Sequence, residues 1–78
     1  MIKETIIRII TNKIGVRFTY DQLDTPFCDV KMDSIDLLQL LMRCEKQFCM
    51  NIPDDDLDNV HTVNDLCDII QRQKNEHP

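Results

Sequence analysis

One serine of this sequence is flanked by aspartates at a place where its hydroxyl could carry a phosphate group. The residues are Asp33-Ser34-Ile35-Asp36, and they stand where an irregular segment enters the most strongly periodic stretch of the chain. An α-helix begins with free backbone N–H groups and the positive end of its dipole, which would stabilise a phosphate attached to Ser34. Asp33 could instead merely cap the helix, with Asp36 three residues on. From the local pattern alone, a simple cap is the more common explanation.

Other combinations of reactive residues are weaker. The acidic segment 54–58 partly matches the start of a calcium loop, but Asn59 replaces the expected glycine and Asp65 the expected glutamate. A solvated acidic turn is the simpler interpretation. A nucleophilic triad would need Ser34 next to His61, and nothing in the sequence brings the two together. We therefore predict no catalytic residue and no metal site.

The four cysteines do not indicate disulfides. We expect no signal peptide, because Arg8 interrupts the apolar run 6–10 and no small-residue cleavage site follows. We expect reduced cysteines that act as small apolar residues of a cytoplasmic protein. Cys44 and Cys49 lack the Cys-x-x-Cys spacing of a zinc site. No apolar run approaches the roughly 20 residues that span a membrane.

The apolar residues predict four helices. Residues 2–14 place isoleucines at helical spacing, and Gly15 is a natural end. The strongest helix covers residues 34–48, and the segment 54–60 suits one or two turns. Thr62 and Asp65 resemble a capping box that opens a last helix, which we expect to end near residue 70.

The rest of the chain is expected to be irregular. Residues 71–78 form a polar tail, which leaves about 2–70 as the ordered core. Residues 15–33 have no sustained periodicity, and a loop of this length in a small domain is usually functional or fastened by its own side chains. The candidates for fastening it are Val16, Phe18, Leu23, Phe27 and Val30.

The helix at 34–48 carries two apolar stripes. At about 100° per residue, the inner stripe consists of Leu37, Leu40, Leu41, Cys44 and Phe48. The second consists of Ile35, Leu38 and Met42, and a surface helix normally needs only one stripe. Either the helix is buried on two sides, or the second stripe contacts a partner. Because few other elements could cover it, we expect a partner.

Length and charge limit the possible functions. The 78 residues suffice for one domain with a modest core, which disfavours a deep enzyme active site. The net charge is −5, and residues 19–68 hold twelve acidic against three basic side chains. This acidic segment would repel nucleic acid and attract a basic patch on a protein partner.

Three motifs together resemble the acyl carrier protein family. The first is Asp33-Ser34-Ile35-Asp36, which is similar to the family's Asp-Ser-Leu-Asp attachment motif. The second, residues 48–54, resembles its Phe-x-x-x-Ile-Pro-Asp stretch, and the third is Thr62-Val63 before the last helix. The resemblance covers about residues 2–70. Val30-Lys31-Met32 departs from the pattern, because it lacks the usual glycine before the motif.

The resemblance implies a fold, a cofactor and partners. The fold would be an all-α four-helix bundle with a short third helix and a long first loop. Ser34, next to Asp33, would carry 4′-phosphopantetheine, attached by a phosphopantetheinyl transferase. Acyl-processing enzymes with basic docking patches would recognise the second helix through Ile35, Asp36, Leu38, Met42 and Glu45.

The expected protein is a monomeric carrier for fatty acid or related lipid biosynthesis, not an enzyme. Two alternatives remain open at this stage: an aminoacyl, peptidyl or polyketide carrier in specialised biosynthesis, and a helical interaction module without a prosthetic group.

Overall fold

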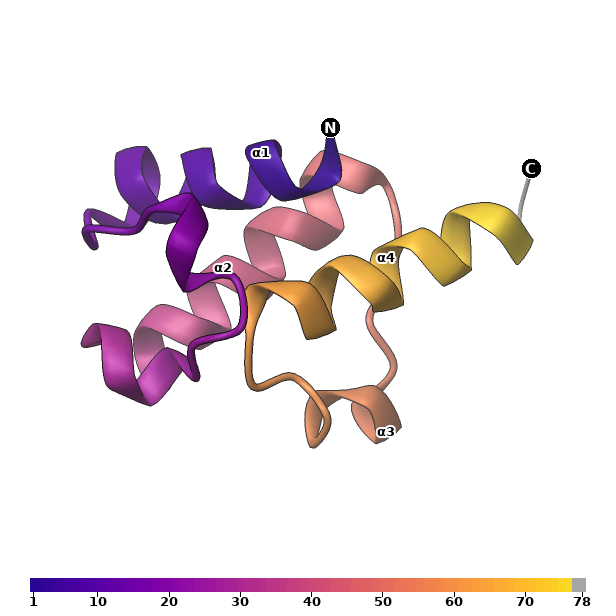
Figure 1. Ribbon diagram of the computed structural model, residues 1–78. Helices are drawn as coiled ribbons and strands as arrows, with labels where there is room; N and C mark the ends of the chain where they lie inside the picture. The colour runs from indigo at the N-terminus through magenta and orange to yellow at the C-terminus, as the bar shows by residue number, and fades with distance from the viewer. Residues whose placement is uncertain (77–78) are drawn as a thin grey trace.

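The computed structural model describes residues 1–76, and within that range it contains helices and no strand. The four α-helices are α1 (Ile2–Arg8), α2 (Ser34–Phe48), α3 (Asp54–Leu57) and α4 (Val63–Glu76). As Figure 1 shows, α1 lies along one side of the bundle, α2 passes behind α4, and the short α3 lies at the opposite side from α1. The predicted all-α bundle with a short third helix is confirmed.

The first helical segment is more varied than the isoleucine spacing predicts. After α1 the backbone continues as a π-helix, η1 (Ile9–Ile14), and ends at Gly15, whose φ of 83° lies in the left-handed region. Glycine adopts this conformation without a steric penalty, so the predicted stop is confirmed. α1 packs against α4, and η1 packs against α2.

The core lies between these helices and the long loop. The inner stripe of α2 contributes Leu40, Leu41 and Cys44, which are buried, whereas Leu37 and Phe48 are half-buried at its edges. The first helical segment and α4 supply a further group of buried apolar side chains, which are Ile6, Ile7, Ile9, Ile10, Val63, Leu66, Cys67, Ile69 and Ile70.

The long loop between η1 and α2 contains two short 3₁₀ turns, η2 (Tyr20–Gln22) and η3 (Phe27–Val30). Phe18, Phe27 and Val30 are buried and fasten it to the core as expected, whereas Val16 and Leu23 are only half-buried. Buried Met32 was not among the predicted contacts.

The last helix starts as predicted and ends later. The N–H of Asp65 donates to Thr62 Oγ1 (3.1 Å), and the N–H of Thr62 donates to Asp65 Oδ2 (3.1 Å), which is the expected capping box. α4 then continues to Glu76 and includes most of the segment expected to be a polar tail. The Gln73 side-chain amide donates to the Asn51 carbonyl (2.6 Å), which ties this extension to the α2–α3 connection. His77 and Pro78 lie outside the described residues.

Candidate functional site

Ser34 is the first residue of α2, and the two aspartates beside it hold that helix end in place. Asp33 is the N-cap in extended conformation. Its Oδ1 accepts a hydrogen bond from the N–H of Asp36 (2.9 Å), and Asp36 Oδ2 accepts one from the N–H of Asp33 (3.3 Å). This reciprocal box fixes the backbone on both sides of Ser34 while leaving the serine side chain exposed.

The helix end around Ser34 suits a phosphate. The N–H groups of Ser34 and Ile35 belong to the first turn, where an α-helix offers backbone donors without intrahelical acceptors. The positive end of the helix dipole adds a favourable field for negative charge. Because the Ser34 side chain is exposed, a group esterified to its oxygen could extend into solvent or along the surface. The residues present therefore fit a serine-linked phosphodiester.

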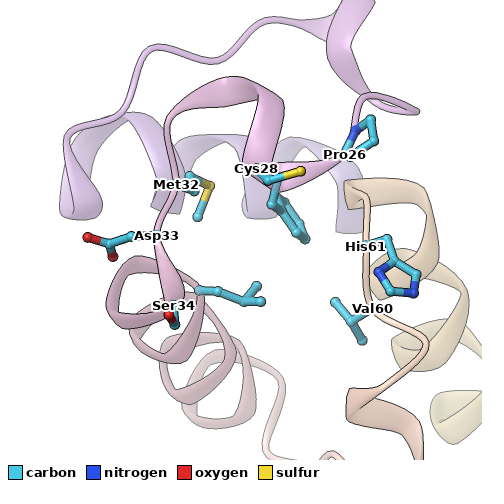
Figure 2. Close-up of a pocket in the computed structure, with 9 residues that line it drawn as sticks. Pro26, Cys28, Met32, Asp33, Ser34, Val60 and His61 are labelled. Carbon is cyan, nitrogen blue, oxygen red and sulfur yellow. The ribbon is translucent and has the colours of Figure 1, made fainter.

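A cavity of about 190 Å³ opens beside Ser34 (Figure 2). It is lined by the end of the long loop, the start of α2 and the segment before α4: Pro26, Phe27, Cys28, Met32, Asp33, Ser34, Leu37, Val60 and His61. The N–H of Phe27 donates to the His61 carbonyl (2.8 Å), which joins two of these walls. Nearby, the N–H of Asn64 donates to the Leu23 carbonyl (3.1 Å). These bonds fix the loop against the segment before α4 and the first turn of α4, so the cavity has defined walls.

The second apolar stripe of α2 is exposed. The exposed fractions are 66% for Ile35, 57% for Leu38 and 58% for Met42. Burial of the helix on two sides is therefore wrong, and no other part of the chain within residues 1–76 covers this stripe. Ser34 and the stripe share one helix, so a partner that contacts the stripe also approaches Ser34.

The two carboxylates of α2 both have intramolecular partners. Asp36 belongs to the N-terminal box described above. Glu45 is half-buried, and its Oε2 accepts a hydrogen bond from the N–H of Ile52 (2.8 Å), seven residues ahead. This bond ties the end of α2 to the segment that precedes α3. Glu45 therefore has a structural role that the sequence did not reveal.

The structure does not assemble the weaker candidate sites of the sequence among the residues that it describes. Ser34 and His61 line the same cavity, which the sequence did not predict, but Figure 2 shows them on opposite sides of it. Among residues 1–76 no group of acidic, histidine and cysteine side chains could hold a metal ion. No described helix is long and apolar enough to cross a membrane.

The cysteines divide into two classes, which corrects the expectation that all four act as apolar residues. All are free thiols; Cys44 and Cys67 are buried, whereas Cys28 and Cys49 are exposed. Burial raises the pKa of the Cys44 thiol to about 12, and it raises the pKa of Cys67 as well. Cys28 lies on the wall of the cavity, and Cys49 ends α2 with a positive φ of 53°.

The far wall of the cavity is the part of the site that the sequence did not reveal. Phe27 was expected only to fasten the loop, and no role was assigned to Val60. Both are buried apolar residues in short irregular segments, Phe27 directly after Pro26 and Val60 two residues before Thr62. The only indication in the sequence that they would be buried was therefore their hydrophobicity.

Comparisons with known proteins agree with this geometry. A family model described as a phosphopantetheine attachment site matches residues 4–70. The acyl carrier protein of Porphyromonas gingivalis is 32% identical over 72 residues, covering 91% of this chain and 92% of that protein. The acyl carrier protein of Chlamydia trachomatis is 32% identical over 75 residues, covering 95% and 97%. Proteins of this kind are carriers rather than enzymes, and they act with acyl-processing enzymes and a phosphopantetheinyl transferase. The chain therefore belongs to the acyl carrier protein family, whose prosthetic group is covalent 4′-phosphopantetheine.

Proposed function

We propose that this chain carries acyl groups as thioesters on a phosphopantetheine arm attached to Ser34, for fatty acid or related lipid biosynthesis in the cytoplasm. The observation that carries the proposal is the position of Ser34: an exposed hydroxyl at the N-terminus of α2, between the two residues of a capping box. Ser34 is also the only serine in the sequence. The names of the relatives support an acyl cargo.

The residues around Ser34 have separate roles in this proposal. The first-turn N–H groups of α2 and the helix dipole stabilise the phosphodiester charge. Asp33 and Asp36 hold the helix end rigid, because each accepts from the other's backbone. The arm supplies a terminal thiol that can hold an acyl group. The walls of the cavity are partly apolar and can shelter the first part of the acyl chain; the apolar residues are Phe27, Met32, Leu37 and Val60.

The exposed stripe of α2 is the proposed docking surface. Ile35, Leu38 and Met42 present apolar side chains on the helix that begins with Ser34. Asp33 and Asp36 place negative charge at the Ser34 end, and this charge would attract basic residues of the transferase and of acyl-processing enzymes. Docking on α2 would then bring Ser34 to the partner's active site.

Intact-mass measurement after incubation with coenzyme A, Mg²⁺ and a broad-specificity phosphopantetheinyl transferase tests the attachment residue. The wild-type chain should gain the mass of one phosphopantetheine, and Ser34→Ala should gain none while keeping its helical circular dichroism. Gln39→Ala is the matched control, since Gln39 is exposed on the same helix and should not affect the gain. Modification of the Ser34→Ala variant would show that another residue carries the arm.

A further inference from the structure

The charges on α2 change sign along the helix. Its acidic end lies at Asp33 and Asp36, whereas Arg43 and Lys46 are exposed in its C-terminal half. Lys46 follows Met42 by four residues, so it continues the line of the exposed apolar stripe. With Lys13 of η1, these two cations line one surface hollow of about 280 Å³. We call Lys13, Arg43 and Lys46 the basic patch.

The basic patch has no anionic partner among residues 1–75, whose side chains the structure describes. The single ion pair found there joins the N-terminal ammonium to Glu4, in the first turn of α1. Glu45 is the acidic residue nearest in sequence to Arg43 and Lys46, and its carboxylate is hydrogen-bonded to Ile52. Three like charges gathered at one hollow repel each other, and no ion pair among the described side chains offsets this repulsion. The patch therefore lacks an internal structural explanation, although the protein as a whole is acidic.

We propose that the cognate acyl-processing enzyme carries carboxylates opposite the basic patch, beside an apolar pocket for Ile35, Leu38 and Met42. This inference rests on the proposed function of the chain. The docking face of this enzyme would carry basic residues opposite the Ser34 end of α2 and acidic residues about 16 Å further along. This distance is the rise of an α-helix from Ile35 to Lys46. Enzymes whose docking faces are basic throughout would be repelled at the patch, which gives the carrier partner selectivity.

An enzyme surface fits better than the other possible occupants. A small anion would be held by the three cations alone and would leave the adjoining apolar stripe uncovered. A second copy of the chain could offer the acidic α3 region, but its own net charge of −5 opposes association. The apolar stripe and the basic patch form one continuous surface, as expected for an interface with an apolar centre and a charged rim.

The test uses the chain after full conversion by the transferase, with the mass of the arm on Ser34 confirmed first. A chain that cannot be converted would contradict the proposed function. The measurements below concern the basic patch alone. The probe is an acyltransferase that acts on carrier proteins and has an arginine-lined docking face. A second form of the probe has the arginines facing the C-terminal half of α2 changed to glutamate.

The variant is Arg43→Glu/Lys46→Glu, and the control is Lys3→Glu/Arg72→Glu, which changes the net charge equally through exposed residues of α1 and α4. We expect the patch variant to raise kcat/KM about tenfold with the arginine-lined probe and lower it about tenfold with the glutamate-lined probe. The melting temperature of the patch variant should be the same as that of the control, because both add the same negative charge to the chain. The control should change both constants less than about twofold.

Equal changes for variant and control would show that only net charge matters, and would overturn the proposal. The proposal would also be overturned if the ratio of kcat/KM between the two probes were the same for the patch variant as for the wild-type chain. Size-exclusion chromatography of the wild-type chain at the assay concentration provides a further check. If the wild-type chain is a dimer and the patch variant is a monomer, a second copy of the chain, not an enzyme, occupies the patch, and the proposal is overturned.

Discussion

At the scale of single residues, the site depends on a few backbone positions with unusual requirements. Asp33 and Asp36 satisfy the start of α2, and the sequence predicted both because capping residues are recognisable from type and spacing. Lys31 shows what the sequence did not explain. It takes the place where the resembling family has glycine, and its φ of 62° lies in the left-handed region that glycine favours. The chain thus has, at this turn, a lysine in a backbone conformation that favours glycine, and the residue is strained there.

Replacement of Lys31 by glycine should stabilise the fold. A non-glycine residue in the left-handed region costs about 1–2 kcal/mol, and part of this gain is offset by the greater freedom of glycine in the unfolded chain. We expect Lys31→Gly to raise the free energy of unfolding in urea by roughly 0.5–1 kcal/mol. Arg17→Gly, an exposed loop position without a positive φ, should lower it instead. A loss of stability in Lys31→Gly would mean that the lysine side chain makes up for its backbone strain.

The buried thiol of Cys44 should make the fold sensitive to alkaline pH. Its pKa is raised from 9.0 to about 12 in the folded state by burial, so the unfolded chain loses this proton first as the pH rises. The stabilising effect is complete below pH 9 and is lost between about pH 9 and 12, at up to about 1.4 kcal/mol per pH unit. Urea unfolding at pH 8 and pH 10.5 measures this loss. Cys44→Ala should show a shallower decline; an equally steep one would assign the effect to other groups.

At the scale of elements, α2 combines a buried and an exposed apolar stripe. Both were predictable, because helical periodicity assigns residues to faces, and a bundle of this size has too few elements to cover two faces. The π-helical turns of η1 were not predictable, because isoleucines spaced three and four apart suit either kind of helix. The far wall of the cavity was also not predictable from the sequence. The hydrogen bond from Phe27 to His61 joins residues far apart in the sequence, so it leaves no local pattern.

Charge placed on the exposed stripe should weaken partner binding without unfolding the protein. Leu38→Glu and Met42→Glu affect exposed side chains, so we expect the free energy of unfolding to change by about 0.5 kcal/mol or less. Leu40→Glu on the buried stripe is the control, and it should unfold the domain because an unpaired charge would enter the core. Thermal melting and the rate of modification by the transferase measure the two effects. If Leu38→Glu melts as low as Leu40→Glu, the exposed stripe is part of the core.

At the scale of the whole molecule, negative charge opposes the compact state. The net charge is −5, and the single ion pair among the described residues involves the chain terminus. The distribution of acids was predictable from the sequence, whereas the lack of pairing for the basic patch required the structure. The same charges that attract basic partners therefore weaken the fold at low ionic strength.

Added salt should therefore stabilise the protein. Raising NaCl from about 10 to 150 mM shortens the screening length from about 30 to 8 Å, which weakens repulsion between the acidic segments. We expect the melting temperature to rise, by about 4–8 °C for each kcal/mol gained in a domain of this size. Asp55→Asn/Asp58→Asn, which removes two exposed charges, should respond less to salt. A melting temperature that stays constant over this range would mean that the acids do not repel appreciably.

The most direct test of the central claim, that Ser34 holds an acyl-loaded arm, is tandem mass spectrometry of the chain purified from the cells that make it. We predict that the peptide containing Ser34 carries phosphopantetheine on the serine oxygen, with a fraction bearing an acyl group. Neutral hydroxylamine should release that acyl group and leave the arm in place, because a thioester is cleaved while the phosphodiester is not. An unmodified Ser34, or an arm located on any other residue, would contradict the account.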